Sequence, residues 1–252
     1  MDEKVVLSVL IPVRNEPEGI TIIVKVLKAL IEVPHELLII TDNQKDSTIP
    51  FIQFLCRQFP NVKHIENTNK RGVLNAIKAG VSASQGEYIM IYAADEVGPV
   101  LAISQMLQLM NRGCDLVSGT RYAKGGKRYG GSRIGHFLSR VANRLFGLMT
   151  STELSDCTTG LKMFRADIFP KFSFVSAGTG WSFAFDMSIE AQVLRLKIGE
   201  VPIVSIDRLF GGKSSMKLMP WICAYFKCFI RGMKELPPWR SSTPCMQVCE
   251  NE

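Results

Sequence analysis

Short apolar runs alternate with amphipathic segments through the first half of the chain. The apolar runs are continuous and rich in β-branched residues, which is typical of strands covered by helices on both faces. They predict strands at residues 5–13, 35–43, 61–66, 87–92 and 114–122. The segments between them carry apolar residues three and four positions apart, which predicts helices at 19–33, 48–59, 72–84 and 99–113. This alternation predicts an α/β fold with a doubly wound, mostly parallel sheet.

The pattern changes after residue 122. A Gly-rich basic stretch, AKGGKRYGGSR at 123–133, is longer than a simple connection and is typical of a lid or binding loop. A second basic loop, RLFGGKSSMKL, occupies residues 208–218. Between the two loops we expect helices at 136–149 and 185–196 and strands near 156–164 and 199–207.

The length of 252 residues suits one catalytic-sized unit better than two full domains. We expect a domain over residues 1–217 and a C-terminal helical appendage over 218–252 that ends in a frayed tail. The N-terminal apolar run is short and begins acidic, so it predicts a core strand rather than a signal peptide. No stretch reaches the ~18 apolar residues of a membrane span. The prediction is a cytoplasmic protein, soluble or peripheral on the cytoplasmic face of a membrane.

Composition narrows the classes of partner. The hydrophobic content of 46% and charged content of 21% are those of a globular chain. A net charge of +7 favours an acidic partner such as a nucleoside diphosphate, a phospholipid surface or nucleic acid. The basic residues gather in two loops rather than along one stripe, which argues against nucleic acid. Seven cysteines at irregular spacings, without C-x-x-C pairs, indicate reduced and mostly buried thiols.

Polar residues follow several of the predicted strands. In a doubly wound sheet, ligands bind beyond the carboxyl ends of the strands. No G-x-G-x-x-G loop follows the first strand, and GGKS at 211–214 lacks the first glycine of a P-loop, which argues against both of those nucleotide-binding classes. The residues that we expect to converge on one crevice are Asn15, Glu16, Asp42, Asn43, Asp95, Glu96 and Arg121.

The stretch YIMIYAADEVGPV at 88–100 runs from a buried strand into two adjacent carboxylates, Asp95 and Glu96. A solvated turn fits this pattern, and so does a metal site. An enzyme that transfers a sugar from a nucleoside diphosphate needs a hard cation, Mg²⁺ or Mn²⁺, held by one or two carboxylates. Side chains alternate along a strand, so Asp95 and Glu96 point to opposite sides unless the strand ends between them, and Gly98-Pro99 favours such an ending. Asp95 is therefore the expected ligand and Glu96 a conditional second one.

Six stretches occur in an order that resembles a known family. They are LSVLIPVRNE, LLIITDNQKDST, NTNKRGVLNAIKAGVSASQGEYIMIYAADE, LVSGTRY, LSDCTTGLKMFR and GEVPI followed by RLFGGKSSMKL. In these the chain resembles the inverting family 2 glycosyltransferases of GT-A fold, most closely the dolichyl- or polyprenyl-phosphate sugar synthases. The resemblance implies metal-assisted transfer of a sugar, in a single displacement, from a nucleotide-diphosphate sugar to an acceptor.

The same resemblance implies a donor site. Pro12, Asn15 and Glu16 match the turn beside the base and ribose, and Asp42 with Asn43 matches an acidic position on the nucleoside. Further donor-site positions are implied at Lys70, Gly72, Asn75, Ala94, Lys213 and Ser214. Two plain alternatives stay open: a helix cap at 46–48 and a solvated loop at Lys70.

The chain departs from its relatives at Ala93. The dolichyl-phosphate mannose synthases have Asp-Ala-Asp, and the first of those acids aligns with Ala93. The sequence Ala94-Asp95-Glu96 is similar to the Ala-Asp-Asp of a bacterial-type set of relatives. Because an acid is missing, a non-catalytic nucleotide-sugar-binding protein remains the rival interpretation.

The acceptor is open between a lipid phosphate and a glycan or glycolipid hydroxyl. Arg121 resembles the arginine that meets the acceptor phosphate, and Arg208 belongs to the segment that closes over the donor diphosphate. A hydroxyl acceptor needs a general base, for which Asp156 is the candidate, whereas a phosphate acceptor is already ionised. A simple turn cap at Asp156 fits the sequence equally well.

The segment after Pro220 mixes aromatic residues with Lys227 and Arg231. This composition is typical of a helix lying in a membrane interface. A helix packed on the domain's own core would show the same apolar face, so both interpretations stay open.

Overall fold

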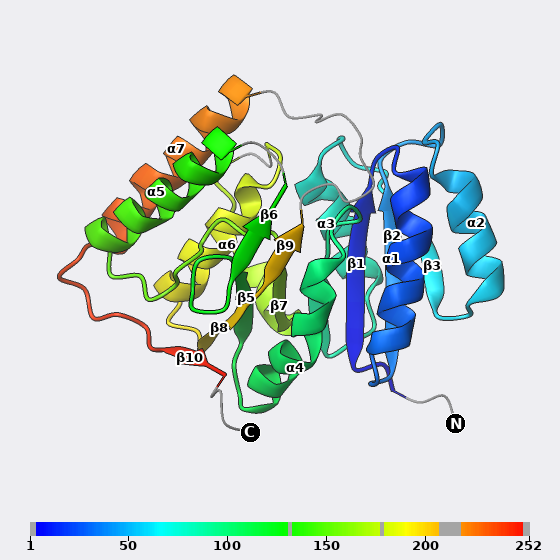
Figure 1. The fold of residues 1–252 in the computed structure, drawn as a ribbon, viewed down its shortest axis with the longest axis horizontal. Helices are drawn as coiled ribbons and strands as arrows, with labels where there is room; N and C mark the ends of the chain where they lie inside the picture. The colour runs from blue at the N-terminus through cyan, green and yellow to red at the C-terminus, as the bar shows by residue number, and fades with distance from the viewer. Residues whose placement is uncertain (1–3, 131–132, 177–178, 207–217, 249–252) are drawn as a thin grey trace.

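Eight strands form one sheet, in the order β10-β8-β5-β7-β4-β1-β2-β3 (Figure 1). The computed structural model describes residues 4–130, 133–176, 179–206 and 218–248. The strands of this sheet are β1 (Leu7–Val13), β2 (His35–Thr41), β3 (Val62–Glu66), β4 (Tyr88–Ile91), β5 (Leu116–Thr120), β7 (Lys162–Arg165), β8 (Ile198–Pro202) and β10 (Cys245–Gln247).

The sheet is parallel except at β7. β1 runs parallel to β2 and β4, and β5 runs parallel to β8. β7 lies between β4 and β5 and is antiparallel to both. Two strands that are each antiparallel to a third run in the same direction, so β4 and β5 present their carboxyl ends at one edge. The predicted doubly wound, mostly parallel α/β fold is confirmed.

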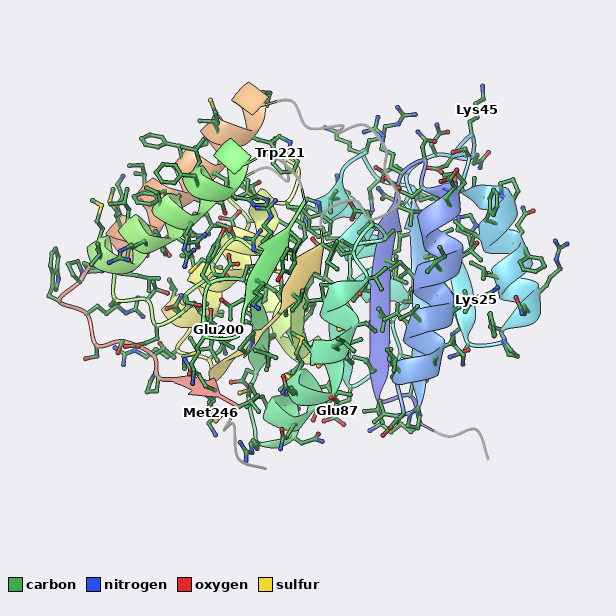
Figure 2. The ribbon with its side chains drawn as sticks, in the orientation of Figure 1. Lys25, Lys45, Glu87, Glu200, Trp221 and Met246 are labelled. Atoms are coloured by element: carbon green, nitrogen blue, oxygen red, sulfur yellow. The ribbon has the colours of Figure 1, made fainter. Side chains whose placement is uncertain are left out.

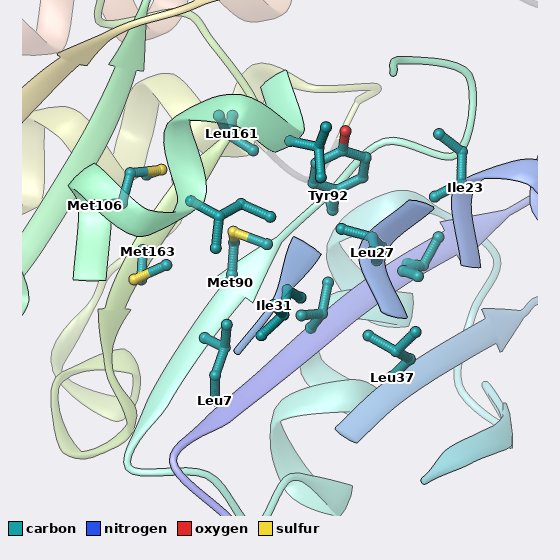
Figure 3. Packing of buried hydrophobic residues seen from close by; sticks show 14 of the residues in the cluster. Leu7, Ile23, Leu27, Ile31, Leu37, Met90, Tyr92, Met106, Leu161 and Met163 are labelled. Carbon is teal, nitrogen blue, oxygen red and sulfur yellow. The ribbon is translucent and has the colours of Figure 1, made fainter. Parts of the chain in front are cut away.

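Helices cover both faces of the sheet (Figure 1). One apolar cluster joins α1 (Pro17–Leu30), α2 (Ile49–Gln58) and α4 (Ile103–Asn111) to one face. Figure 3 shows its centre, where Leu27 of α1 and Met106 of α4 pack toward Met90 of β4. A second cluster joins α3 (Val73–Ala83) and α6 (Ser182–Val193) to the opposite face. Because both faces are covered, the central strands read as continuous apolar runs in the sequence.

The strand β4 ends at Ile91, one residue before its predicted end, so Asp95 and Glu96 lie in the turn beyond it and strand alternation does not separate them. Two other expectations about element boundaries were wrong. The helix predicted from residue 99 begins as a 3₁₀ turn, η1 (Gly98–Ala102), before α4 starts. The tail is not frayed, because β10 pairs in parallel with the outer edge of β8. That edge offers unpaired backbone groups, which even a three-residue segment can satisfy.

A second, two-stranded sheet lies beside the first basic loop. It joins β6 (Lys127–Tyr129) to β9 (Val204–Ile206) in parallel. The Gly-rich stretch predicted as a loop therefore contains a short strand.

The two remaining long helices are α5 (Arg133–Met149) and α7 (Leu218–Glu235), and a short 3₁₀ helix, η2 (Ala166–Lys171), follows β7. α7 packs on α6, where the ring of Tyr225 lies 6.3 Å from that of Phe185 and Arg231 pairs with Asp186 at 3.4 Å. Packing on the domain thus accounts for part of the apolar face of α7. The predicted domain boundary at residue 217 falls outside the described residues.

Among the described helices, none has the length and apolar character needed to cross a membrane. The six cysteines within the described ranges are all free thiols, as the sequence predicts.

Candidate active site

The turns after β1, β2, β4 and β5 lie at one edge of the sheet (Figure 1). This follows from the shared direction of the four strands. The edge carries Asn15 after β1, Asp42 after β2, Asp95 after β4 and Arg121 after β5. Parallel strands thus bring together polar residues that are more than a hundred positions apart in the chain.

The turn after β1 is tied to the turn after β2. Asn15 has φ of 54°, in the left-handed region that asparagine tolerates better than most residues. Its backbone N–H donates to the carboxylate of Asp46 at 3.1 Å, and the N–H of Glu16 donates to Thr48 Oγ1 at 2.9 Å. Asp46 also accepts the N–H of Thr48 at 2.9 Å, which forms a local turn before α2, whereas the N-cap residue of that helix, Thr48, makes no side-chain cap bond. The same two side chains additionally hold the Asn15–Glu16 turn in place.

Asp42 is held by the loop before α3. Its two carboxylate oxygens accept the Asn67 amide at 2.6 Å and the Gly72 N–H at 2.9 Å. Gly72 has φ of 138°, which favours glycine over any side chain. Asn75 donates to the carbonyl of Lys70 at 2.7 Å and fixes the same loop. The predicted positions Asp42, Lys70, Gly72 and Asn75 therefore form one connected unit.

The turn with the two acids is braced from both sides. Tyr92 is buried just before the turn, and its hydroxyl donates to the carbonyl of Val97 at 3.3 Å. Burial raises the pKa of this phenol, and the nearby charge of Glu96 raises it further. A side chain at Gly98 would overlap the carbonyl oxygen of Val204 in β9, so glycine lets the turn lie directly against the small sheet. Asp95 is thereby fixed just beyond the end of β4.

The donor set of this turn suits a hard divalent cation. Asp95 and Glu96 are half-buried and offer carboxylate oxygens from adjacent positions. Mg²⁺ in phosphate-transfer sites is commonly held by one or two carboxylates, with substrate phosphates and water completing the shell. No group of three or more His, Cys, Asp or Glu side chains suited to a metal occurs in the described part of the chain. A cation here would thus depend on substrate oxygens.

Arg121 and Asp156 form a two-pronged ion pair beside the edge. Arg121 Nε donates to Asp156 Oδ2 at 2.7 Å and Nη2 donates to Oδ1 at 2.9 Å. The backbone N–H of Arg121 also donates to Oδ2 at 3.2 Å. Thr158 Oγ1 accepts from Nη2 at 3.0 Å and donates to Oδ1 at 3.0 Å. The side chain of Arg121 is 12% exposed, whereas that of Asp156 is fully buried.

The pair keeps both charges. Burial alone would raise the pKa of Asp156, but the Arg121 guanidinium and its hydrogen bonds hold that pKa below its ordinary value. Burial alone would lower the pKa of Arg121, but Asp156 and, more weakly, Glu96 raise it. A general base must be able to reach a substrate proton. The geometry does not support that role for Asp156, which is buried and saturated with donors.

A buried row of polar side chains lies beneath the pair. Glu200 on β8, Ser118 on β5 and Lys162 on β7 occupy paired positions on three neighbouring strands (Figure 2 labels Glu200). Lys162 Nζ donates to Ser118 Oγ at 3.0 Å and to Ser188 Oγ of α6 at 2.8 Å. Burial lowers the pKa of Lys162 to about 8 and raises that of Glu200 to about 7. These groups are too deeply buried for substrate contact.

Other predicted positions are less involved in the described contacts. Pro12 lies within β1, and Ala94 is buried at the start of the acidic turn. Asn43 accepts the N–H of Lys45 at 3.0 Å within its own loop. Three predicted residues fall outside the described residues: Arg208, Lys213 and Ser214.

Sequence reasoning missed several residues that build the site. Asn67 and Thr158 are ordinary polar loop residues that give no local signal. Glu200 and Lys162 did give one, because each is a charged residue inside an apolar strand run. A charge at such a position is seldom buried unless it is paired or hydrogen-bonded.

Comparison with known proteins identifies a family for most of this chain. The family described as Glycosyl transferase family 2 matches residues 8–172. A dolichol-phosphate mannosyltransferase of Pyrococcus furiosus is 31% identical over 121 residues, which is 48% of this chain and only 34% of that relative. The polyprenol monophosphomannose synthase of Mycolicibacterium smegmatis is 27% identical over 210 residues, covering 81% of this chain and 78% of its own.

The fold is also that of solved glycosyltransferases. The crystal structure of glucosyl-3-phosphoglycerate synthase from Mycobacterium tuberculosis, in complex with Mn²⁺, uridine-diphosphate-glucose and phosphoglyceric acid, matches with a TM-score of 0.66 at 15% identity. The match covers 91% of this chain and 80% of that structure. The family match extends over residues 8–172, which is more than half of the sequence, so the chain belongs to glycosyl transferase family 2.

Proposed function

We propose that the protein transfers a sugar from a nucleoside-diphosphate sugar to a polyprenyl phosphate, with inversion at the anomeric carbon. Its family and its similarity to a polyprenol monophosphomannose synthase over 81% of the chain support a lipid-phosphate acceptor. The observation that carries the choice of acceptor is the Arg121–Asp156 pair.

The pair favours a phosphate over a hydroxyl as nucleophile. A hydroxyl has to lose a proton during the reaction, and Asp156 is not free to take it. A phosphate monoester is already ionised near neutral pH and needs only a cation to hold it. Arg121 is partly exposed, and its Nη1 is not among the atoms that Asp156 holds, so it can offer that atom to an anion. The two N–H groups of Nη1 are donors of a permanently charged guanidinium, which suits phosphate recognition.

The reaction requires no proton transfer from the protein. An oxygen of the acceptor phosphate forms a bond to the anomeric carbon, and the bond from that carbon to the donor diphosphate breaks. The electron pair leaves with the diphosphate, and a single displacement inverts the configuration. Asn15, Glu16 and Asp42 would orient the nucleoside, with Lys70 and the α3 N-terminus beside them. Asp95, with Glu96, would hold Mg²⁺ or Mn²⁺, whose charge neutralises the leaving diphosphate.

The remaining diphosphate contacts of the proposal rest on the sequence resemblance. Arg208, Lys213 and Ser214 would contact the donor diphosphate from the second basic loop. Positive charge placed where negative charge develops lowers the barrier to bond breaking.

An exposed apolar stripe on α5 supports peripheral contact with a membrane. At 100° per residue its members share one side of the helix, opposite the buried Asn143 and Phe146. Arg140 and Arg144 are exposed along one border of the stripe. An exposed apolar stripe bordered by cations suits the interface of an anionic bilayer. The stripe consists of Phe137, Leu138, Val141, Leu145, Leu148 and Met149, with exposed fractions between 36% and 71%.

The same helix reaches the proposed acceptor site. Asn143 donates to Thr158 Oγ1 at 3.0 Å, and Thr158 in turn bonds Arg121 and Asp156. Ser139 accepts the hydroxyl of Tyr122 at 2.7 Å. A lipid phosphate held at Arg121 would therefore lie near the side of α5 that carries Ser139 and Asn143, and its hydrocarbon chain would have to extend past the helix to reach the exposed stripe. α7 lies alongside, with Phe226 62% exposed (Figure 1).

The test is direct transfer of labelled sugar. The purified protein is incubated with Mg²⁺ or Mn²⁺, polyprenyl phosphate and a panel of nucleoside-diphosphate sugars, and sugar in the lipid fraction is counted. Asp95→Asn should abolish transfer, while Asp167→Asn, at an exposed position, should not. The anomeric configuration of the product reports inversion. Donor binding without any turnover of polyprenyl phosphates or glycan hydroxyls would instead favour a non-catalytic nucleotide-sugar-binding protein.

A further inference from the structure

The carboxylate of Glu200 holds the backbone turn that carries Asp156. Glu200 Oε1 accepts the N–H of Ser155 at 2.8 Å and the N–H of Asp156 at 3.1 Å. Its Oε2 accepts the hydroxyl of Ser155 at 2.9 Å. Glu200 is 1% exposed, so these bonds have no competition from bulk water. A buried backbone N–H that loses its acceptor is left without a hydrogen bond, which is unfavourable, so the position of the turn depends on Glu200.

A second path leads from the same carboxylate to the loop around Arg121. Ser155 Oγ lies 2.6 Å from Thr120 Oγ1. Thr120 Oγ1 also accepts the backbone N–H groups of Tyr122 and Ala123, each at 3.2 Å. Glu200 is therefore connected to Arg121 by two routes. One runs through Asp156, the ion-pair partner of Arg121, and the other runs through Thr120 and Tyr122, the neighbours of Arg121 in the chain.

We propose that Glu200 is a positioning residue for the acceptor site: it fixes the Ser155–Asp156 turn so that Asp156 presents the Arg121 guanidinium toward the acceptor phosphate. Glu200 itself touches no substrate. The inference rests on the proposed function only for the identity of the bound anion, since the coupling between Glu200 and Arg121 is a property of the protein alone.

The other titratable groups near Glu200 do not hold the Ser155–Asp156 turn in its place. Lys162 neighbours it across β5, but the ammonium group donates to Ser118 and Ser188 instead. The Cys245 thiol of β10 also lies near Glu200, and its pKa is raised by burial and by the Glu200 charge. Within the described contacts, Glu200 accepts the donors of the turn and no cation bonds to it directly.

Substitutions at Glu200 separate positioning from charge. In Glu200→Gln the amide oxygen can accept both backbone N–H groups, and Ser155 can turn its hydroxyl toward Thr120. Glu200→Leu removes all acceptors, and Glu200→Asp keeps the charge but shortens the side chain by one methylene. The matched control is Glu36→Leu. Glu36 is also 1% exposed and also accepts a hydroxyl and a backbone N–H, from Ser8 and Gln85, but it lies at the opposite end of the sheet.

The first readout needs no activity. The Nε–H signal of Arg121 in a ¹⁵N-labelled sample, assigned with Arg121→Lys, reports protection of that proton from exchange with water. We expect protection to fall at least tenfold in Glu200→Leu and Glu200→Asp and to persist in Glu200→Gln and Glu36→Leu. Unchanged protection in Glu200→Asp would overturn the proposal, even if Glu200→Leu did not fold.

The second readout is steady-state kinetics with polyprenyl phosphate. Loss of positioning should raise the acceptor KM about tenfold in Glu200→Asp and leave the donor KM within about twofold, because the donor site is built from other strands. Equal changes in both KM values would point to general disorder and contradict the proposal. A wild-type enzyme inactive on every polyprenyl phosphate would disprove the proposed function, while the exchange result for Arg121 would still stand or fall separately.

Discussion

Arg121 Nε and Asp156 Oδ2 lie 2.7 Å apart in an ion pair whose acid is completely buried. The pair joins the end of β5 to a loop 35 residues further along the chain. The same bonds that compensate the buried charge also fix the orientation of the guanidinium, with Nε and Nη2 directed at Asp156. In the proposed function, this orientation would direct Nη1 toward the acceptor phosphate.

Asp156→Asn should destabilise the protein strongly. Removing one charge of a buried pair leaves the other uncompensated, which typically costs about 3–5 kcal/mol. Urea unfolding followed by circular dichroism measures the loss. Asp167→Asn is the comparison, because Asp167 pairs with Arg165 at 3.3 Å on the surface, where such pairs contribute about 1 kcal/mol or less. Similar losses in the two variants would contradict the importance of burial here.

Asp95 and Glu96 should differ in their effect on metal dependence. Asp95→Asn is expected to lower kcat/KM by at least a hundredfold at saturating Mn²⁺. Glu96→Gln should mainly raise the Mn²⁺ concentration that gives half-maximal activity, because a second or water-mediated ligand contributes less. Metal titration of the chelator-treated enzyme distinguishes the two. Metal-independent activity of the wild type would contradict both expectations.

The stripe on α5 should bind anionic vesicles. Replacing Leu148, which is 71% exposed, by glutamate puts a charge where the bilayer would accept an apolar group. Co-sedimentation of the Leu148→Glu protein with vesicles in which about one third of the phospholipid is anionic should fall at least fivefold. Phe54→Glu on α2, at the other side of the molecule, is the control (Figure 1). Activity on a short-chain, water-soluble lipid phosphate should survive both changes, and equal vesicle binding by all three proteins would exclude this surface.

Glu200 should make the folded state less stable as pH rises, which is the opposite of the effect of a carboxylate whose pKa is lowered by folding. Burial raises its pKa from 4.5 to about 7, so between these values the folded state holds a proton that the unfolded state has released. Stability contributed by this group therefore falls as pH rises from about 4.5 to 7, by up to about 1.4 kcal/mol per pH unit. Glu200→Gln removes the titration. The free energy of unfolding of the wild type, minus that of the variant, should decline across this window and stay level above it.

Truncation before Cys245 should destabilise the fold. The three residues of β10 cover the edge of β8, the strand that carries Glu200. Without them β8 becomes an edge strand and Met246 no longer packs against the core. We expect a fall in Tm of at least about 4 °C, corresponding to about 1–2 kcal/mol for a chain of this size. An unchanged Tm would restore the expectation of a frayed tail.

Much of the fold could be predicted because its signals are local. The apolar runs of β1, β2 and β4 and the helical spacing of α1 follow directly from the sequence. The place of β7 between β4 and β5 does not, because strand order depends on contacts between distant segments. β10 escaped prediction because three residues are too few to show a period.

The site was predictable to a similar degree. Asp42, Asp95 and Arg121 could be placed at one edge because parallel strands end together. Whether a carboxylate is free or already bound depends on its neighbours in space, so the engagement of Asp156 by Arg121 could not be foreseen. A helix cap at 46–48 was one of two open alternatives, and nothing in the sequence indicates that Asp46 also holds Asn15.

The antiparallel strand β7 also sets a length scale. It inserts one extra strand between β4, which leads to Asp95, and β5, which leads to Arg121. Neighbouring strands lie about 4.8 Å apart, so the two strand ends are separated by about 10 Å. A single inserted strand thus acts as a spacer between the turn that carries Asp95 and the end of β5 that carries Arg121. In the proposed reaction, the transferred sugar would lie between these two ends.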